Sequence, residues 1–423
     1  MRYVHPAFPG RFVHLCYCLN VAPAEDLAGV EEVIRRVALP LRARFDPSGL
    51  FGVGLYLPAR AAFELALPGG AAGAFAARLV DGGLHAFTFN AFPFGGFHRP
   101  GLKEGVFAPP WHDLRRREYT LAVASIAERC ARAASKDRGG HVSISTHAGG
   151  FGAAGRARAA EGFGEAAAAL LELGAETGVH VVLAIEPEPR SAANDTREFI
   201  ELARSLRSAG ADAAADAGGL EPAQAEAAVT GHLGLCLDAC HAAVEFEAPE
   251  VAVGAAREAG HPLGKLQLSN ALALRDPGSH DAARARFLAL DEPVFLHQTT
   301  AQTRDGSLLR ARDLGEVNAA LVAGERTWLD ALEWRCHFHV PVHLGPAIAS
   351  GLGTTADHAA DLLARALGDP SLWGTRDLHL EVETYTFDVL PREARGAGEL
   401  VDVLERETRH AIDGLHRAGW ALG

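Results

Sequence analysis

The sequence predicts an α/β protein in which alternating strands and helices close into a (β/α)8 TIM barrel. Short apolar runs alternate with helix-like stretches along all 423 residues. Because a parallel return between strands needs a long connection, this alternation indicates parallel strands with helical crossovers. The units number eight or more, and polar residues cluster where each apolar run ends. In a barrel these ends meet at one mouth, whereas an open doubly wound sheet gathers ligands at a single switch point.

Nine apolar runs have the length of β-strands, and helix-like stretches separate most of them. The helical patterns lie at residues 27–45, 70–80, 119–134, 162–178, 195–207 and 354–367. The strand candidates are residues 12–20, 51–58, 84–90, 141–147, 180–189, 233–241, 265–271, 334–343 and 378–386. A standard barrel holds eight strands, so one candidate is in excess. Either WRCHFHV (334–340) or FGVGLYL (51–57) lies outside the closed sheet, or the barrel is modified.

We interpret the chain as one domain, residues 1–423, with insertions at the barrel mouth, because it contains no stretch typical of an inter-domain linker. Residues 208–231 are rich in Ala and Gly and weakly patterned, which predicts a helical or mobile excursion. Residues 275–317 are too long for a simple crossover and include FLHQTTAQTRDG. Long loops at a barrel mouth often act as lids, so we expect this second insertion to cover the mouth.

The composition predicts a substantial core and, by default, a cytoplasmic location. Hydrophobic residues make up 48% of the chain, and the net charge is −13. No apolar run reaches the length of a membrane span, and the N-terminus lacks the apolar segment of a secretory signal. The acidic charge argues against nucleic acid as a partner, so we expect a small-molecule metabolite, and a homo-oligomer is left open. The absence of a C-x-x-C pair favours reduced, buried thiols for Cys16, Cys18, Cys130, Cys236, Cys240 and Cys336.

Carboxylates and a histidine follow several of the strand candidates. Glu186 follows the apolar positions of HVVLAIEPEP, and Asp238 and His241 do the same in LGLCLDACH. In LHLEVETYT, Glu381 and Glu383 are two residues apart and therefore share one face of the strand. A divalent cation relieves the repulsion between carboxylates that meet at one mouth and uses their oxygens as ligands. Mixed shells of Asp, Glu and His suit Mn, Zn, Fe or Co.

Each of these residues also has an ordinary structural explanation. Taken singly, an Asp or Glu at such a position is more often a helix N-cap or an ion-pair partner, and Asp238 is placed to cap the next helix. Because Glu186, Asp238 and Glu383 all occur at equivalent strand ends, a shared metal site is the more economical account. Further candidates are Gln267 in KLQLSNA and His337, His339 and His343 in WRCHFHVPVH.

A second group of candidates lies in the loop FTFNAFPFGGFHRPGLKEGVFAPPW, residues 87–111. One interpretation is a surface loop that is packed by its own aromatic residues. The other is the wall of a substrate pocket, in which Arg99 and Lys103 hold an anionic or polyhydroxy group. The substrate-binding candidates are Asn20, Asn90, His98, Arg99, Lys103 and His297. Because they end or flank other strands, His14, Ser145 and His147 are expected at the same mouth.

GLCLDACH (234–241) resembles the sixth-strand motif of the xylose isomerase-like TIM barrels, which include sugar isomerases and epimerases and the endonuclease IV family. LAIEPEP resembles their fifth-strand Glu motif, LQLSNA their seventh-strand segment and EVET their last-strand Glu. The resemblance implies that Glu186, Asp238 and Glu383 are metal ligands and that His241 is a ligand or a substrate contact. The seventh strand of these barrels commonly supplies a histidine where this chain has Gln267. His297 and His339 are the alternatives for that ligand.

The whole chain is similar to the metabolite traffic protein EboE family. The matching stretches are HLCYCLN, FTFNAFPFGGFHR, SISTH, HFHVPV and VETYTFDVLP. This resemblance implies a role in making or exporting a small metabolite, alongside partner proteins of the same pathway. It names no reaction.

Three hypotheses about function follow. The leading one is a metal-dependent enzyme similar to sugar isomerases and epimerases that acts on a small polar metabolite, with Glu186, Glu383 and His241 as catalytic residues. Its expected ligand set is Glu186, Asp238, Glu383, His241, Gln267 and His339. The second hypothesis is metal-dependent phosphoester hydrolysis, which needs more histidine ligands, offered by His98, His297, His337 and His339. The third is a non-catalytic metabolite-binding or carrier protein.

Overall fold

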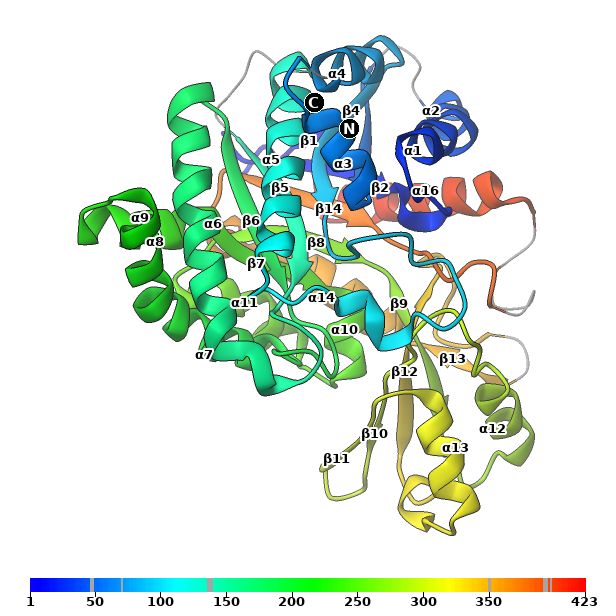
Figure 1. The fold of residues 1–423 in the computed structure, drawn as a ribbon. Helices are drawn as coiled ribbons and strands as arrows, with labels where there is room; N and C mark the ends of the chain where they lie inside the picture. Colours follow the sequence, from blue (N-terminus) through cyan, green and yellow to red (C-terminus); the bar gives the residue numbers. More distant parts are fainter. Residues whose placement is uncertain (46–48, 70, 135–139, 349–350, 391–394, 396–397) are drawn as a thin grey trace.

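Eight parallel strands of the computed structural model close into a barrel, which confirms the predicted (β/α)8 fold (Figure 1). The structure describes residues 1–45, 49–69, 71–134, 140–348, 351–390, 395 and 398–423. Each barrel strand pairs with the next in chain order, and the last returns to pair in parallel with the first. These strands are β2 (Phe12–Cys18), β3 (Phe51–Tyr56), β4 (Leu84–Asn90), β5 (His141–His147), β6 (His180–Glu186), β7 (Leu233–Asp238), β8 (Leu263–Leu268) and β14 (Asp377–Val382).

Helices return the chain between these strands and cover the outside of the barrel (Figure 1). Their apolar faces join the outward side chains of the strands in one hydrophobic cluster; Phe199 and Leu202 of α7, for example, are fully buried in it. The helices are α1 (Leu27–Val33), α2 (Leu39–Ala43), α3 (Ala59–Ala66), α4 (Ala72–Asp81), α5 (Leu114–Ala134), α6 (Arg156–Thr177), α7 (Thr196–Ser205), α8 (Ala211–Gly218), α9 (Pro222–His232), α10 (Ala239–Val244), α11 (Pro249–Ala259), α14 (Ala356–Gly368) and α16 (Leu400–Arg417). Most of residues 208–231 therefore lie in α8 and α9.

Two short strands at the chain ends extend the sheet at the start of β2. Strand β1 (Arg2–Val4) pairs antiparallel with β2, and β15 (Ala421–Leu422) pairs antiparallel with β1. The two ends of the described chain therefore lie side by side at the amino-terminal end of the barrel, away from the mouth. None of the described helices is long and apolar enough to cross a membrane.

A second sheet leaves the barrel directly after β8 and lies beside the mouth (Figure 1). It has five antiparallel strands in the order β11-β10-β12-β9-β13, and the chain returns to the barrel through α14. Its elements are β9 (Asn270–Arg275), α12 (Asp281–Leu288), β10 (Thr299–Gln302), β11 (Leu308–Ala311), α13 (Leu314–Val322), β12 (Glu333–Val340) and β13 (Gly353–Thr354). We call residues 270–354 the inserted sheet. It overlaps the stretch 275–317, and our interpretation of the chain as one domain stays a prediction.

Strand β12 is the ninth strand candidate and belongs to the inserted sheet, whereas FGVGLYL forms β3 inside the barrel. Alternate residues of β12, Trp334, Cys336 and Phe338, are buried in an apolar cluster of the inserted sheet. The residues that alternate with them, which include His337 and His339, are on the opposite face of the strand. This alternation turns two histidines of the inserted sheet toward the mouth of the barrel.

The barrel interior contains an ion pair directly below the mouth. Lys265 of β8 donates to the Oε2 atom of Glu381 at 2.5 Å, and both side chains are fully buried. A Cβ atom at Gly54 of β3 would lie 1.8 Å from the Oε1 atom of Glu381, so only glycine leaves room for this carboxylate. Burial is the largest influence on the pKa of Lys265 and lowers it, but Glu381 and the other neighbouring groups together outweigh burial and leave that pKa above its ordinary value.

Candidate metal centre at the barrel mouth

Three carboxylates meet at the mouth, as the strand-end pattern predicts. Glu186 ends β6, Asp238 ends β7 and Glu383 follows β14 directly. One oxygen from each lies within 4.8 Å of the other two, and all three side chains are buried. One oxygen of each carboxylate has no hydrogen-bond partner among the described residues: Oε2 of Glu186, Oδ2 of Asp238 and Oε2 of Glu383. Buried carboxylate oxygens normally have a partner, so this arrangement fits a cation.

Neighbouring groups fix the direction of two of these carboxylates. Oδ1 of Asp238 accepts the backbone N–H of His241 at 2.8 Å and thereby caps helix α10. The side-chain amides of Asn20 and Asn90 donate to Oε1 of Glu383 at 2.6 and 3.1 Å. In each case one oxygen is held and the other is left for a ligand. Asp238 is therefore both a helix cap and a member of the carboxylate group, so the two explanations do not exclude each other.

The electrostatics of this group also favour a cation. Burial raises the pKa of Glu186 and Glu383 well above the ordinary range, and repulsion from neighbouring carboxylates raises both further. Burial also raises the pKa of Asp238, and it raises that of Glu188 to about 8. Without a cation, these groups hold protons that exposed carboxyls lose below neutral pH. A divalent ion stabilises their ionised forms and lowers their pKa values.

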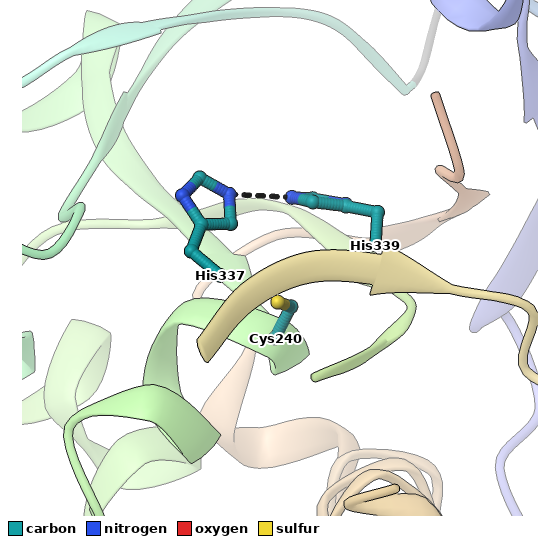
Figure 2. Close-up of side chains that lie close together, drawn as sticks. All are labelled: Cys240, His337 and His339. Atoms are coloured by element: carbon teal, nitrogen blue, oxygen red, sulfur yellow. Dashed lines mark hydrogen bonds between the residues drawn. The ribbon is translucent and has the colours of Figure 1, made fainter. Parts of the chain in front are cut away.

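Three histidine rings meet beside the carboxylates. His337 and His339 come from β12, and their Nε2 atoms are 2.9 Å apart (Figure 2). The Nε2 atom of His241, from α10, lies 3.1 Å from the Nε2 atom of His337. Burial lowers the pKa of His241 to about 3 and that of His339 to about 4, so both rings are neutral at neutral pH. Neutral imidazole is a common metal ligand.

Among the described residues, four groups of side chains have potential ligand atoms within 4.8 Å of one another. Besides the carboxylate group, they are Asp238, His241 and His339; Glu188, His241 and His337; and Cys240, His337 and His339. Burial raises the pKa of Cys240 well above its usual range, so its thiol is protonated. The oxygen and imidazole donors of the first three groups fit Mn, Zn, Fe or Co.

Aromatic side chains cover the site from two directions. Phe97, in the loop after β4, packs against Tyr385 and against Phe295 of the inserted sheet, with ring centroids 5.4 and 6.0 Å apart. Below this cover lies a cavity of about 60 Å³, lined by Glu186, Glu383, the three histidines and other residues of the mouth. This volume suits an ion with a few waters or a small ligand.

The loop at 87–111 is placed at the mouth, but its candidates have different roles. Lys103 lines the cavity, where its ammonium group lies 2.8 Å from Asp313. The ring of His98 contacts the carbonyl of Asn20 at 2.7 Å and packs at a tilt against the ring of Phe97, so it holds the loop in place. Arg99 is exposed and does not line the cavity.

Two other candidates are not in position to touch a ligand in this cavity. The ring of His297 stacks on Phe338 and pairs with Glu292 at 2.8 Å inside the inserted sheet. Gln267 pairs in register with Asp238 on the neighbouring strand. Its Oε1 atom accepts a hydrogen bond from the thiol of Cys236 at 2.8 Å. Neither residue lines the cavity.

The residues that flank other strands are divided between the two ends of the barrel. The ring of His147 packs against Phe92 of the loop at 87–111. Ser145 is buried two residues earlier in β5. His14 is instead at the amino-terminal end, where it lies 3.5 Å from Asp377 and lines a separate cavity of about 400 Å³. The expectation that His14 lies at the mouth is therefore wrong, because it precedes the carboxyl end of β2 by four residues.

Three polar residues that line the cavity are not in the site expected under the leading hypothesis. Glu188, His337 and Tyr385 all line the cavity. Two of them carry a signal in the sequence: Glu188 and Tyr385 lie two residues beyond Glu186 and Glu383, in EPEP and ETY, and so continue the same face. The position of His337 depends on the packing of the inserted sheet, which no local pattern reveals.

Comparisons with known proteins give similarity to solved structures alone. No protein-family model matches the chain, and no curated protein matches it. One similar structure is the probable 3-DHS dehydratase AsbF involved in petrobactin synthesis from Bacillus anthracis, with 13% identity and a TM-score of 0.45 over 95% of this chain and 99% of that one. Another is an IolI protein with a binding zinc atom, with 9% identity and a TM-score of 0.43 over 96% of this chain and 98% of that one.

Proposed function

We propose that the protein is a metal-dependent enzyme, similar to sugar isomerases and epimerases, that acts on a small polar hydroxycarbonyl metabolite. One observation carries the proposal: three buried carboxylates, each with an oxygen that has no hydrogen-bond partner among the described residues, come within 4.8 Å of one another beside a cavity of about 60 Å³. A divalent ion held by Glu186, Asp238 and Glu383 would polarise a substrate carbonyl and acidify the neighbouring C–H bond. His339 is the best placed further ligand, because its group includes Asp238.

The proposed catalytic groups are two of the carboxylates at the mouth. Burial raises the pKa of Glu186 and of Glu383, and a bound ion would lower it again, so each carboxylate could serve both as a ligand and as a group that accepts and returns a proton. Two such groups on opposite faces of a substrate carbon would invert it. His241 would hold a substrate oxygen or share in binding the ion. Gln267 is left out of the ligand set, since its oxygen already accepts a hydrogen bond.

The lining of the cavity favours an uncharged substrate over a phosphoester. Lys103 is the one lysine or arginine among the described residues that line the cavity, and Asp313 already pairs with it. The polar groups of Asn90 and Tyr385 suit hydroxyl groups. As the resemblance to the EboE family implies, the metabolite would belong to a biosynthesis or export pathway; this part of the proposal rests on the sequence motifs alone.

Deuterium exchange tests the proposed proton transfer even when the product has not been identified. The protein, loaded with Mn²⁺, Zn²⁺, Fe²⁺ or Co²⁺ in turn, is incubated in D₂O with a panel of small aldoses and ketoses, and incorporation next to the carbonyl is followed by NMR. We expect at least one substrate to exchange, and Glu186→Gln and Glu383→Gln to slow exchange by about 10²–10⁴-fold.

A matched control and two other assays complete the experiment. Glu128→Gln changes a buried carboxylate on the outer helix α5 and should leave exchange unchanged. Binding of the panel without exchange would contradict the proposal and favour a carrier. Release of phosphate from phosphoesters, without exchange, would favour hydrolysis.

A further inference from the structure

The histidine cluster contains a contact that the carboxylate-bound ion does not explain. His337 projects from the inserted sheet and His241 from the barrel helix α10, and their Nε2 atoms lie 3.1 Å apart. The Nε2 atom of His337 also lies 2.9 Å from that of His339. Two ring nitrogens at this distance need either a shared proton or a common cation between them. The protons on the other ring nitrogens decide which is needed.

The orientation of His337 follows from its neighbour Gln298. The side-chain amide of Gln298 donates to Oε1 of Glu188 at 2.8 Å and to the carbonyl of Pro189 at 3.1 Å, which turns its own oxygen the other way. That oxygen lies 2.6 Å from Nδ1 of His337. An amide oxygen only accepts hydrogen bonds, so Nδ1 of His337 carries the proton and donates it. The Nε2 atom of the neutral ring is therefore a bare lone pair.

The other two rings are held in the same way. Nδ1 of His241 lies 3.1 Å from the carbonyl oxygen of Pro187, and Nδ1 of His339 lies 2.9 Å from the carbonyl oxygen of Glu383. Both backbone oxygens are acceptors, so both rings donate through Nδ1 and leave Nε2 as a lone pair. Ligating histidines are typically held through a backbone carbonyl or carboxylate in this manner.

The lone pair of His337 thus lies about 3 Å from those of His241 and His339, and the described groups around them cannot satisfy all three. The hydroxyl of Tyr385, 3.2 Å from Nε2 of His337, has one proton to donate. A proton shared between two rings satisfies one contact. Metal–imidazole bonds of about 2.0–2.1 Å place neighbouring ligand nitrogens about 3 Å apart, which matches the observed separations.

We propose that the protein binds a second metal ion through Glu188, His241 and His337, beside the ion of the carboxylate group. These three side chains offer ligand atoms within 4.8 Å of one another and come from three parts of the fold: the segment after β6, helix α10 and strand β12. The ion would fasten the inserted sheet over the mouth. Its two nitrogen ligands and one oxygen ligand suit Zn²⁺ or Co²⁺ rather than Mg²⁺ or Ca²⁺.

Metal stoichiometry tests this second site independently of any catalysis. The full chain is stripped of metal, saturated with Zn²⁺, freed of excess and analysed for zinc per chain by mass spectrometry. We expect about two ions for the unchanged protein, about one for His337→Ala and about one for Glu383→Gln, since each substitution removes a ligand from a different site. His343→Ala is the matched control and should keep both ions, because His343 is outside all the ligand groups found among the described residues.

The outcomes separate the two sites. Two ions in His337→Ala, or one in the unchanged protein, would overturn the second site. If Glu383→Gln loses zinc and His337→Ala loses no zinc, the second site is wrong and the proposed function stands. If His337→Ala loses zinc and Glu383→Gln loses no zinc, the ion of the carboxylate group is wrong and the second site stands. If His337→Ala does not fold, anomalous diffraction from Zn²⁺-soaked crystals of the unchanged protein decides. A peak about 2 Å from the Nε2 atoms of His241 and His337 supports the proposal, and no peak there overturns it.

Discussion

Replacement of Lys265 by Met should destabilise the barrel more than most single substitutions. Its ammonium group lies 2.5 Å from Oε2 of Glu381, and both side chains are fully buried. At this distance and an effective dielectric constant of about 20, the attraction between the charges is about 7 kcal/mol. The cost of removing both ions from water offsets part of it. Loss of one partner leaves the other charge buried, so we expect the free energy of unfolding to fall by about 3–5 kcal/mol.

A double-mutant cycle measured by urea unfolding isolates this interaction. Lys265→Met and Glu381→Met are each expected to destabilise, whereas the double variant should recover most of the loss, because no charge remains buried. The coupling energy between the two sites should be about 3 kcal/mol or more. Single effects that add up in the double variant to within about 0.5 kcal/mol would refute the reasoning, since they would mean that the pair contributes nothing of its own.

Three further predictions concern pH, helix capping and the aromatic cover. Burial raises the pKa of Glu407 from 4.5 to about 7, so its contribution to stability is complete below about pH 4.5 and lost as the pH rises through about 7. Glu407→Gln should flatten this part of the pH dependence in urea unfolding; an unchanged slope would contradict it. Asp195→Ala removes the cap bond from the N–H of Glu198, 2.9 Å away, and should cost about 1 kcal/mol in the same assay, whereas no loss would exclude a stabilising cap. Phe97→Ala opens the contact with Tyr385 and should speed removal of bound metal by a chelator in stopped flow; an unchanged rate would mean that the cover does not control access.

The alternation of apolar runs and helical patterns is enough to predict the closed barrel. It does not by itself show which of the nine strand candidates lies outside the barrel. Trp334, Cys336 and Phe338 alternate with polar residues, as in an antiparallel strand that buries one face. The barrel strand β3 is buried at every position. Position-by-position alternation therefore marks 334–340 as the strand outside the barrel, although length and hydrophobicity alone do not separate the two.

The carboxylates of the site were predictable because parallel strands bring their ends together. Glu186, Asp238 and Glu383 are placed at one mouth by the strands alone, whatever the loops do. His337 reaches them through a sheet of residues 270–354, whose packing on the barrel depends on contacts far apart in the chain. For the same reason, the sequence does not reveal that Asp313 pairs with Lys103.

The most direct test of the metal centre is anomalous diffraction from crystals of the protein grown with Mn²⁺ or Zn²⁺ and collected at the absorption edge of the metal. We predict a peak within about 2.0–2.3 Å of oxygens from Glu186, Asp238 and Glu383. Asp238→Ala should abolish this peak and leave the barrel unchanged, although the substitution also removes a helix cap. A saturated crystal with no peak among these carboxylates would contradict the account, because their unpartnered oxygens would then be buried without a cation.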